Sequence, residues 1–242
     1  MRTRPPATIP TVGGEQASGG SAGGRSGGAQ LHRSIVAEVL ASLAYGELCG
    51  ARRSQESVQL APDRRSRTEQ QGVADREHQN FQLIEARLKE LGDEQLMELF
   101  RPYFDAFFQH TEPTDWVEAQ TFHYVGDALV SDFADVLVPL LDRVSAEVVR
   151  RALGDREDQE EFALNELNRA IDDDPAVRPR IRTYTQRILG EAFTQTGRAL
   201  EETQGLRTLL GGDEAGKRFV LSLLDRHRQR LDRLGIDPVD TD

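Results

Sequence analysis

The sequence has almost no cysteine and no long uninterrupted apolar run. No run approaches the roughly 18 apolar residues that a membrane-spanning helix needs, and no apolar signal-peptide core follows the first arginines. The single cysteine, Cys49, excludes an intramolecular disulfide. These absences favour a protein of the reducing cytoplasm that does not contact a membrane.

The charge is mainly of one sign. The 242 residues include 41 acidic and 30 basic side chains, which gives a formal net charge of -11. Such an acidic chain argues against broad, nonspecific binding of nucleic acid. A local cluster of arginines near one predicted helix connection could face the phosphates of a nucleotide or tRNA, and the alternative is a solvated helix end. These arginines are Arg52, Arg53, Arg64, Arg65 and Arg67.

Composition divides the chain into three parts. Residues 1–30 are rich in Gly, Ser, Ala and Pro and have no apolar period, which predicts a disordered tail. Residues 31–236 show a helical period almost throughout, and they are enough for one substantial core. Residues 237–242 are predicted to form a short flexible C-terminus.

The predicted fold class is all-α, because no segment shows a convincing period of two. Helices over 31–56 and 64–91 have a short connection, as do helices over 115–141 and 145–171, so each pair is antiparallel. The aromatic-rich segment 93–113, interrupted by Pro102, is predicted to be a short helix pair that crosses the bundle end. One long crossover is typical of a ferritin-like four-helix bundle. Two extra C-terminal helices follow, one from Pro175 to about Leu210 and one ending at Leu234.

Local signals mark several helix ends. Gly92 follows the last apolar residue of the second helix and is a plausible stop. Asp115 and Glu118 resemble a capping box for the third helix. Ser145 is expected to cap the fourth helix.

Two acidic residues of the first helix pair lie on predicted core faces. A ferritin-like diiron centre takes a Glu from two helices and a Glu-x-x-His from the other two, and a buried carboxylate without a cation or partner is costly. Glu47 is in line with Leu40 and Leu43 of the first helix, and Glu77 is on the core face of the second. Asn80 stands where the histidine would be. His78 lies about 100° around the helix from Glu77, at a boundary position.

The second helix pair offers a different set of polar residues. His123 and Asp127 are one turn apart on one face, which suits either a metal or an internal hydrogen bond. In the fourth helix Glu160 is predicted nearest the centre of the core face, and Glu161 further out. Arg156 is also near the centre and suggests an internal ion pair. The fourth helix has no histidine.

Three strings resemble those of a known family. They are LAYGEL at 43–48, PTDWVEAQTFHYVGDALVSDF at 113–133 and ILGEAFTQ at 188–195. The set resembles the ferritin-like proteins of actinobacteria that are grouped with the tRNA-modifying diiron hydroxylase acting on 2-methylthio-isopentenyl-adenosine. The resemblance covers about residues 33–235.

The resemblance implies a ferritin-like helical fold with a centre for diiron or another divalent metal between the first four helices. It also implies reductive activation of dioxygen to hydroxylate an organic substrate. The implied metal ligands are Glu47, Glu77, Asp127 and Glu160, and the secondary candidates are His78, Asn80, His123 and Glu161.

Two functions remain open at this point. The first is a cytoplasmic diiron-type hydroxylase, with a tRNA or nucleotide substrate. The second is a non-catalytic helical module that has lost the metal site and pairs its core acids with Arg156. Such a module would act by homo-oligomerisation or by binding a partner. The aromatic residues of 100–108 are a candidate contact for this binding. Carboxylates that converge within ~4–6 Å, with no cation from the protein between them, would favour the diiron-type hydroxylase. A cation of the protein among them would favour the non-catalytic module.

Overall fold

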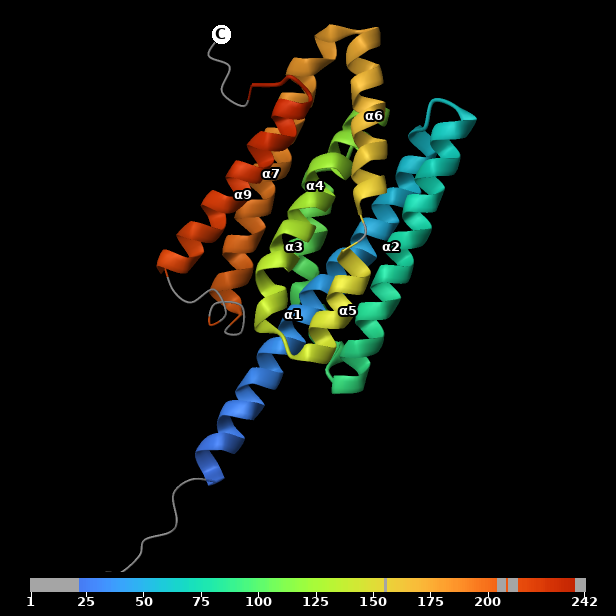
Figure 1. Ribbon diagram of the computed structural model, residues 1–242. Helices are drawn as coiled ribbons and strands as arrows, with labels where there is room; N and C mark the ends of the chain where they lie inside the picture. The colour runs from blue at the N-terminus through green and yellow to red at the C-terminus, as the bar shows by residue number, and fades with distance from the viewer. Residues whose placement is uncertain (1–21, 155, 204–207, 209–212, 238–242) are drawn as a thin grey trace, which may run out of the picture.

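The computed structural model describes residues 22–154, 156–203, 208 and 213–237, and its architecture is helical (Figure 1). No strand occurs in these described ranges, which confirms the all-α prediction. The main bundle consists of four elements that run along a common direction in Figure 1. They are α1 (Ala22–Ser57), α2 (Arg64–Leu91), α4 (Trp116–Leu137) and the successive helices α5 (Arg143–Leu153) and α6 (Glu157–Asp173).

The bundle core joins the helices as the apolar periods predict. Leu40 on α1 and Ile84 on α2 are buried in one cluster, and the short turn η1 (Val58–Leu60) connects these two helices. Phe122 on α4 packs in a second cluster with Leu167 on α6. A long connection separates the two helix pairs, so the ferritin-like arrangement with one crossover is confirmed.

The crossover itself differs from the prediction. It contains a short turn, η2 (Glu94–Leu96), and then one continuous helix, α3 (Met97–His110), with Pro102 inside it. Proline removes one backbone hydrogen bond from a helix. The burial of Phe100 and Tyr103 against the bundle offsets that loss, because large aromatic side chains remove much apolar surface from water.

The predicted fourth helix is in fact two helices, α5 and α6. Asp142 caps α5 by accepting hydrogen bonds from the backbone N–H groups of Val144 and Ser145, so Ser145 is not the cap. The break falls at Gly154, where a Cβ atom would collide with the backbone carbonyl oxygen of Arg150. Only glycine therefore fits this backbone without a shift, and α6 starts anew beyond it.

Other predicted helix ends are confirmed. Gly92 ends α2 in the left-handed conformation at φ 75°. The Asp115 side chain accepts from the N–H of Glu118 at the start of α4. Glu118 in turn accepts from the backbone N–H of Thr114 at 2.8 Å. These local hydrogen bonds fix where α2 ends and where α4 begins.

The two C-terminal helices pack along the bundle, beside α4 (Figure 1). The turn η4 (Pro175–Val177) leads into α7 (Arg178–Glu202), which ends well before the predicted Leu210, and α9 (Asp213–Arg233) follows. The buried Asp132 of α4 holds α9 by ion pairs with Arg226 and Arg230.

The N-terminal boundary also differs from the prediction. Helix α1 begins at Ala22, so residues 22–30 are helical, and this part extends beyond the bundle in Figure 1. The rest of the predicted tail, residues 1–21, and the end of the predicted C-terminus, 238–242, lie outside the described residues.

One helical segment, His32–Leu60, is long and apolar enough to cross a membrane by length and composition. This corrects the expectation that no such segment exists. Its apolar window is 83% buried inside the protein. Its apolar surface therefore faces the core of the bundle.

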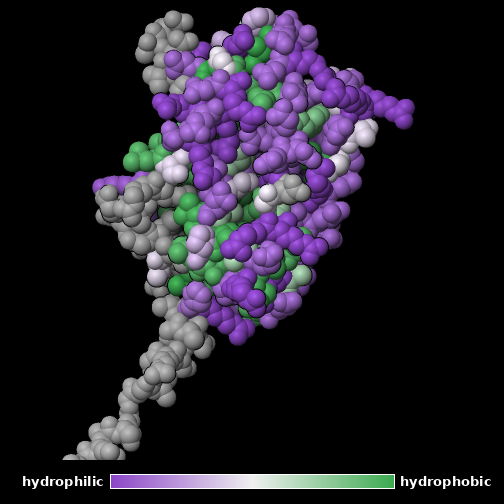
Figure 2. Space-filling view, in the orientation of Figure 1, coloured by the Kyte–Doolittle hydropathy of each residue, from purple (hydrophilic) through white to green (hydrophobic). Residues whose placement is uncertain are grey.

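The surface shown in Figure 2 is divided. Hydrophilic residues cover most of this face, and hydrophobic residues gather mainly in its lower half, with smaller groups near the top and at the left edge. Leu140 of the turn η3 (Val138–Leu140) and Val144 of α5 are among the exposed large hydrophobic residues.

Candidate functional site

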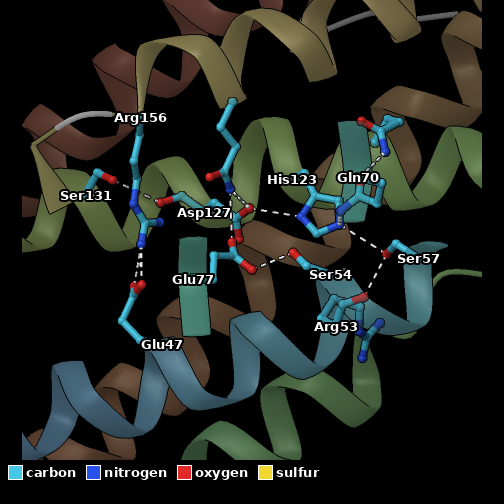
Figure 3. Close-up of polar contacts among 12 residues, drawn as sticks. Glu47, Arg53, Ser54, Ser57, Gln70, Glu77, His123, Asp127, Ser131 and Arg156 are labelled. Carbon is cyan, nitrogen blue, oxygen red and sulfur yellow. Dashed lines mark hydrogen bonds and ion pairs between the residues drawn. The ribbon is translucent and has the colours of Figure 1, made fainter. Parts of the chain in front are cut away.

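Polar side chains from four helices meet in the middle of the bundle (Figure 3). Glu47 comes from α1, Glu77 from α2, Asp127 from α4 and Gln159 from α6, and all four are buried. Arg156, which immediately precedes α6, extends its side chain into the same place. We call these five residues, together with His123 of α4, the polar network.

The shortest contact within the polar network is between Arg156 and Glu47. The Nη2 atom of Arg156 donates to both carboxylate oxygens of Glu47 at 2.5 Å. Burial raises the pKa of Glu47, and the adjacent guanidinium acts against this change. Burial also opposes the charge of Arg156, but the carboxylates of Glu47, Glu77 and Asp127 raise its pKa. Arg156 is thus a cation among three carboxyl groups, and Glu47 is its ion-pair partner.

Glu77 has two neutral hydrogen-bond partners. Ser54 donates to its Oε2 at 2.5 Å, and Gln159 Nε2 donates to its Oε1 at 2.9 Å. The same Gln159 nitrogen donates to Asp127 Oδ2 at 3.0 Å. Burial and the neighbouring Asp127 raise the pKa of Glu77 well above its usual value. The nearby cation, Arg156, bonds to Glu47 instead of Glu77.

His123 is hydrogen-bonded through both ring nitrogens. Its Nδ1 lies 2.9 Å from Asp127 Oδ2, which confirms the internal His–Asp hydrogen bond predicted as one alternative. Its Nε2 lies 3.2 Å from the amide nitrogen of Gln70 and 3.1 Å from the Ser57 hydroxyl. Because Gln70 can only donate through that nitrogen, we assign the ring proton to Nδ1, which donates to Asp127.

These residues do not fit a dimetal centre. Such a centre needs Glu-x-x-His on two helices, whereas α2 carries Glu77-x-x-Asn80 and the start of α6 carries Arg156-x-x-Gln159. Amides stand at both histidine positions, and a guanidinium stands at one carboxylate position. A guanidinium has no lone pair for a metal, and its charge repels one.

A smaller metal site is geometrically available. Glu77, His123 and Asp127 each offer a ligand atom, and these three atoms lie within 4.8 Å of one another. One imidazole and two carboxylates suit a single divalent transition-metal ion. An ion there would displace the His123–Asp127 hydrogen bond and the two bonds from Gln159.

Three of the proposed metal ligands, Glu47, Glu77 and Asp127, converge around Arg156, but the acid from the fourth helix does not join them. Glu160 is 32% exposed and pairs with Arg233 at 2.6 Å, so its predicted position nearest the centre is wrong. Glu161 is 57% exposed and contacts the same arginine. The prediction extended the core face of α5 into α6, but the break at Gly154 changes the helical phase.

The secondary candidates of α2 lie at the edge of the polar network or outside it. Asn80 is partly buried, and its side chain slightly lowers the pKa of Glu47. His78 is exposed, and its Nε2 lies 3.1 Å from the amide nitrogen of Gln82. His78 therefore lies further toward solvent than the predicted boundary position.

Sequence reasoning missed several members and neighbours of this site. Gln159 carried a usable signal, because it is three residues after Arg156 and repeats the spacing of Glu-x-x-His. Ser54 also carried one, because it is seven residues after Glu47 and therefore on the same face of α1. Gln70 and Ser57, which contact His123, come from separate segments and show no local pattern.

The predicted arginine cluster is divided by the fold. Arg53 is buried, with its guanidinium 5.6 Å from the Phe108 ring centroid and 5.3 Å from that of Phe122. It donates to the backbone carbonyl of Thr111 at 3.1 Å. Arg53 is thus a structural residue that ties α1 to the end of α3. The other four arginines, Arg52, Arg64, Arg65 and Arg67, are exposed.

The bundle, its single long crossover and its central carboxylates define a protein of the ferritin-like class. The chain belongs to the family described as "Ferritin-like domain, actinomycetes", whose match covers residues 30–213. It is also similar to a solved structure described as protein 19 with aldehyde deformylating oxidase activity from Synechococcus. That match has 17% identity and a TM-score of 0.69, and it covers 86% of this chain and 93% of the other, which shows the shared fold. No curated protein matches the chain.

Proposed function

We propose that this chain is a ferritin-like protein that acts by binding a ligand and not by dimetal oxygen chemistry. The observation that carries the proposal is the Arg156 guanidinium in the middle of the bundle, bonded to both carboxylate oxygens of Glu47. In a ferritin-like metalloprotein the metal ions balance the charge of the buried carboxylates. Here a side chain of the protein supplies that positive charge.

The remaining groups support the same interpretation. Burial and the neighbouring Asp127 raise the pKa of Glu77 well above its usual value, which opposes a second buried anion at this point. Asp127 accepts from both His123 and Gln159. The carboxyl groups of the polar network are therefore hydrogen-bonded by the protein's own side chains, with Arg156 as the cation among them, and binding two metals would require the displacement of Arg156.

Metal analysis tests the proposal. Protein from iron-supplemented cells is expected to contain well below one equivalent of iron, and a chelator is expected to leave its thermal midpoint unchanged. The double variant Arg156→Glu, Gln159→His restores a Glu-x-x-His at the start of α6 and serves as the positive control. It is expected to gain metal and to lose thermal stability with chelator, since a ligand bound only to the folded state stabilises it. Stoichiometric iron in the native chain that disappears in Glu77→Gln would overturn the proposal.

A second candidate function is the binding of one divalent ion by Glu77, His123 and Asp127, whose ligand atoms lie within 4.8 Å of one another. This candidate predicts one equivalent of metal in the native chain and its loss in His123→Ala. The exposed His78 is the matched control, and His78→Ala should keep the metal. Absence of metal from the native chain, after incubation with iron, zinc and manganese in turn, would exclude this candidate.

The finer predictions of the sequence remain proposals. Hydroxylation of a tRNA or nucleotide would need an oxygen-activating centre that the polar network does not support. Binding of a phosphate-bearing molecule to the exposed arginines Arg52, Arg64, Arg65 and Arg67 stays a prediction, as do homo-oligomer formation and a cytoplasmic location.

A further inference from the structure

An apolar cavity of ≈ 320 Å³ lies between α1, α3, α4, α7 and α9. No charged side chain occurs among the lining residues that the structure describes, and aromatic rings form much of the wall. Protein interiors are close-packed, and voids lower stability in proportion to their volume. A cavity of this size falls in the range of small-molecule sites. Its main apolar walls are Phe100, Phe104, Phe107, Leu129, Phe133 and Phe193.

The cavity lies beside the polar network, on other faces of the helices α1 and α4. Gly46 and Gly126 line the cavity, and the residues that follow them, Glu47 and Asp127, belong to the polar network. A Cβ atom on Gly46 would be 3.0 Å from the ring of Phe104. The bare backbone of α1 therefore forms one wall of the cavity, in close contact with an aromatic ring.

The cavity reaches the surface between α7 and α9. Two of its lining residues, Gly197 on α7 and Val220 on α9, are exposed. A Cβ atom on Gly197 would have no other heavy atom within 4 Å, so there is open space at this point. A ligand can therefore enter from solvent along α7.

We propose that this cavity binds one neutral, hydrocarbon-like molecule of roughly twelve carbon atoms, since a cavity of about 150 Å³ holds benzene. The inference rests on the proposed function, because it names the class of ligand that is bound. A charged molecule would lose its hydration and find no counter-charge on the lining. Four of the described lining residues carry polar side-chain groups, and two of them already have partners: Tyr103 donates to Glu202, and the Gln195 amide bonds Glu191 and Arg198. The other two, Ser42 and Thr196, have hydroxyls that suit a single alcohol or carbonyl group on the ligand.

Titration calorimetry with three probes tests the ligand class. The probes are 1-decanol, 2-naphthol and decanoate, and decanoate matches decanol in chain length but carries a charge. The expected result is saturable binding of one molecule of decanol or naphthol, with decanoate at least tenfold weaker. Preference for decanol identifies a chain-like ligand, and preference for naphthol identifies a ring-like one. No saturable binding of either neutral probe, or equal binding of decanoate, would overturn the inference.

Two glycine substitutions test the location. Gly197→Phe fills the open side of the cavity, and Gly190→Phe is its matched control, because both glycines lie on α7 with open space at Cβ and only Gly197 lines the cavity. Replacing glycine within a helix does not lower helix propensity, so both variants should fold. Gly197→Phe is expected to weaken binding at least tenfold and Gly190→Phe less than twofold. Equal effects would place the ligand elsewhere and overturn the inference.

Metal content is measured on the same samples. Stoichiometric iron would overturn the proposed function, whereas failure of the neutral probes to bind would overturn only the assignment of the cavity. The two failures are therefore distinguishable in one set of preparations.

Discussion

The polar network and the apolar cavity both use residues of α1 and α4, yet they differ in how far the protein's own side chains occupy them. Neighbouring residues serve the two regions, with Glu47 and Asp127 in the polar network and Gly46 and Gly126 in the cavity wall. Each carboxyl group of the polar network has partners within the chain, whereas the cavity leaves ≈ 320 Å³ between apolar walls. In the polar network only the Arg156 Nε is a buried polar atom without a hydrogen-bond partner among the described residues, so few of its groups are left for a ligand. The proposed ligand therefore belongs in the cavity, and the role proposed for the polar network is structural.

The largest expected effect comes from the cation of the polar network. Arg156→Ala leaves Glu47 buried without its ion-pair partner, and breaking a buried pair from one side typically lowers the free energy of unfolding by about 3–5 kcal/mol. The measurement is urea unfolding followed by circular dichroism. The matched control is Arg233→Ala, which removes an arginine that pairs with Glu160 and Glu161 at the surface. That loss should be only about 0–1 kcal/mol.

Similar losses for the two arginine variants would contradict the structural role of the polar network. A further outcome would sharpen the comparison. If Arg156→Ala regains stability when a divalent metal is added, the guanidinium and a metal ion are alternative ways to balance the same carboxylates.

A smaller effect is expected from the proton on Glu77. Because burial and Asp127 raise the pKa of Glu77 above its usual 4.5, the folded state keeps a proton that the unfolded state releases above that pH. The free energy of unfolding should therefore fall as pH rises from 4.5 to the folded-state pKa, by up to about 1.4 kcal/mol per pH unit. Glu77→Gln is neutral at every pH and lacks this slope.

Thermal midpoints of the native chain and of Glu77→Gln, measured from pH 4 to pH 8, check this prediction. The midpoint of Glu77→Gln relative to the native chain should rise with pH. Glu69→Gln, on the exposed side of the same helix, is the control and should show a constant difference. A constant difference for Glu77→Gln as well would show that Glu77 is ionised in the folded state.

Local and periodic features of the fold were predictable from the sequence. The end of α2 at Gly92 and the cap at Asp115 follow from short-range hydrogen bonds. Glu47 and Glu77 were found because they share a helical stripe with apolar residues. The His123–Asp127 bond was also predictable, because residues four apart lie on one face of a helix.

The remaining parts of the site depend on events that a periodic pattern does not record. The break at Gly154 changes the phase of α6, which turns Gln159 inward and leaves Glu160 at the surface. The same break brings Arg156 to the start of a helix, from which it reaches Glu47. The cavity is made by the packing of five helices, so no single stretch of sequence indicates it.

The smallest expected effect is a gain in stability on the cavity side of the comparison. Ala192 lines the cavity and is only partly buried, so Ala192→Leu should bury additional apolar surface where the native chain leaves space. Cavity-filling substitutions commonly raise the free energy of unfolding by about 0.5–2 kcal/mol, and we expect about 1 kcal/mol here. The control Thr194→Leu changes an exposed position of the same helix and should show almost no change.

Thermal unfolding with and without 1-decanol checks this last prediction and separates filling from general stabilisation. Without decanol, Ala192→Leu should have a thermal midpoint about 2–4 °C above the native value. With decanol the advantage should shrink, because the leucine occupies space that the ligand fills in the native chain. A loss of stability in Ala192→Leu would mean that the wall is already close-packed at this point. The cavity would then hold no free space for a ligand at this wall, and the contrast with the hydrogen-bonded polar network would be contradicted.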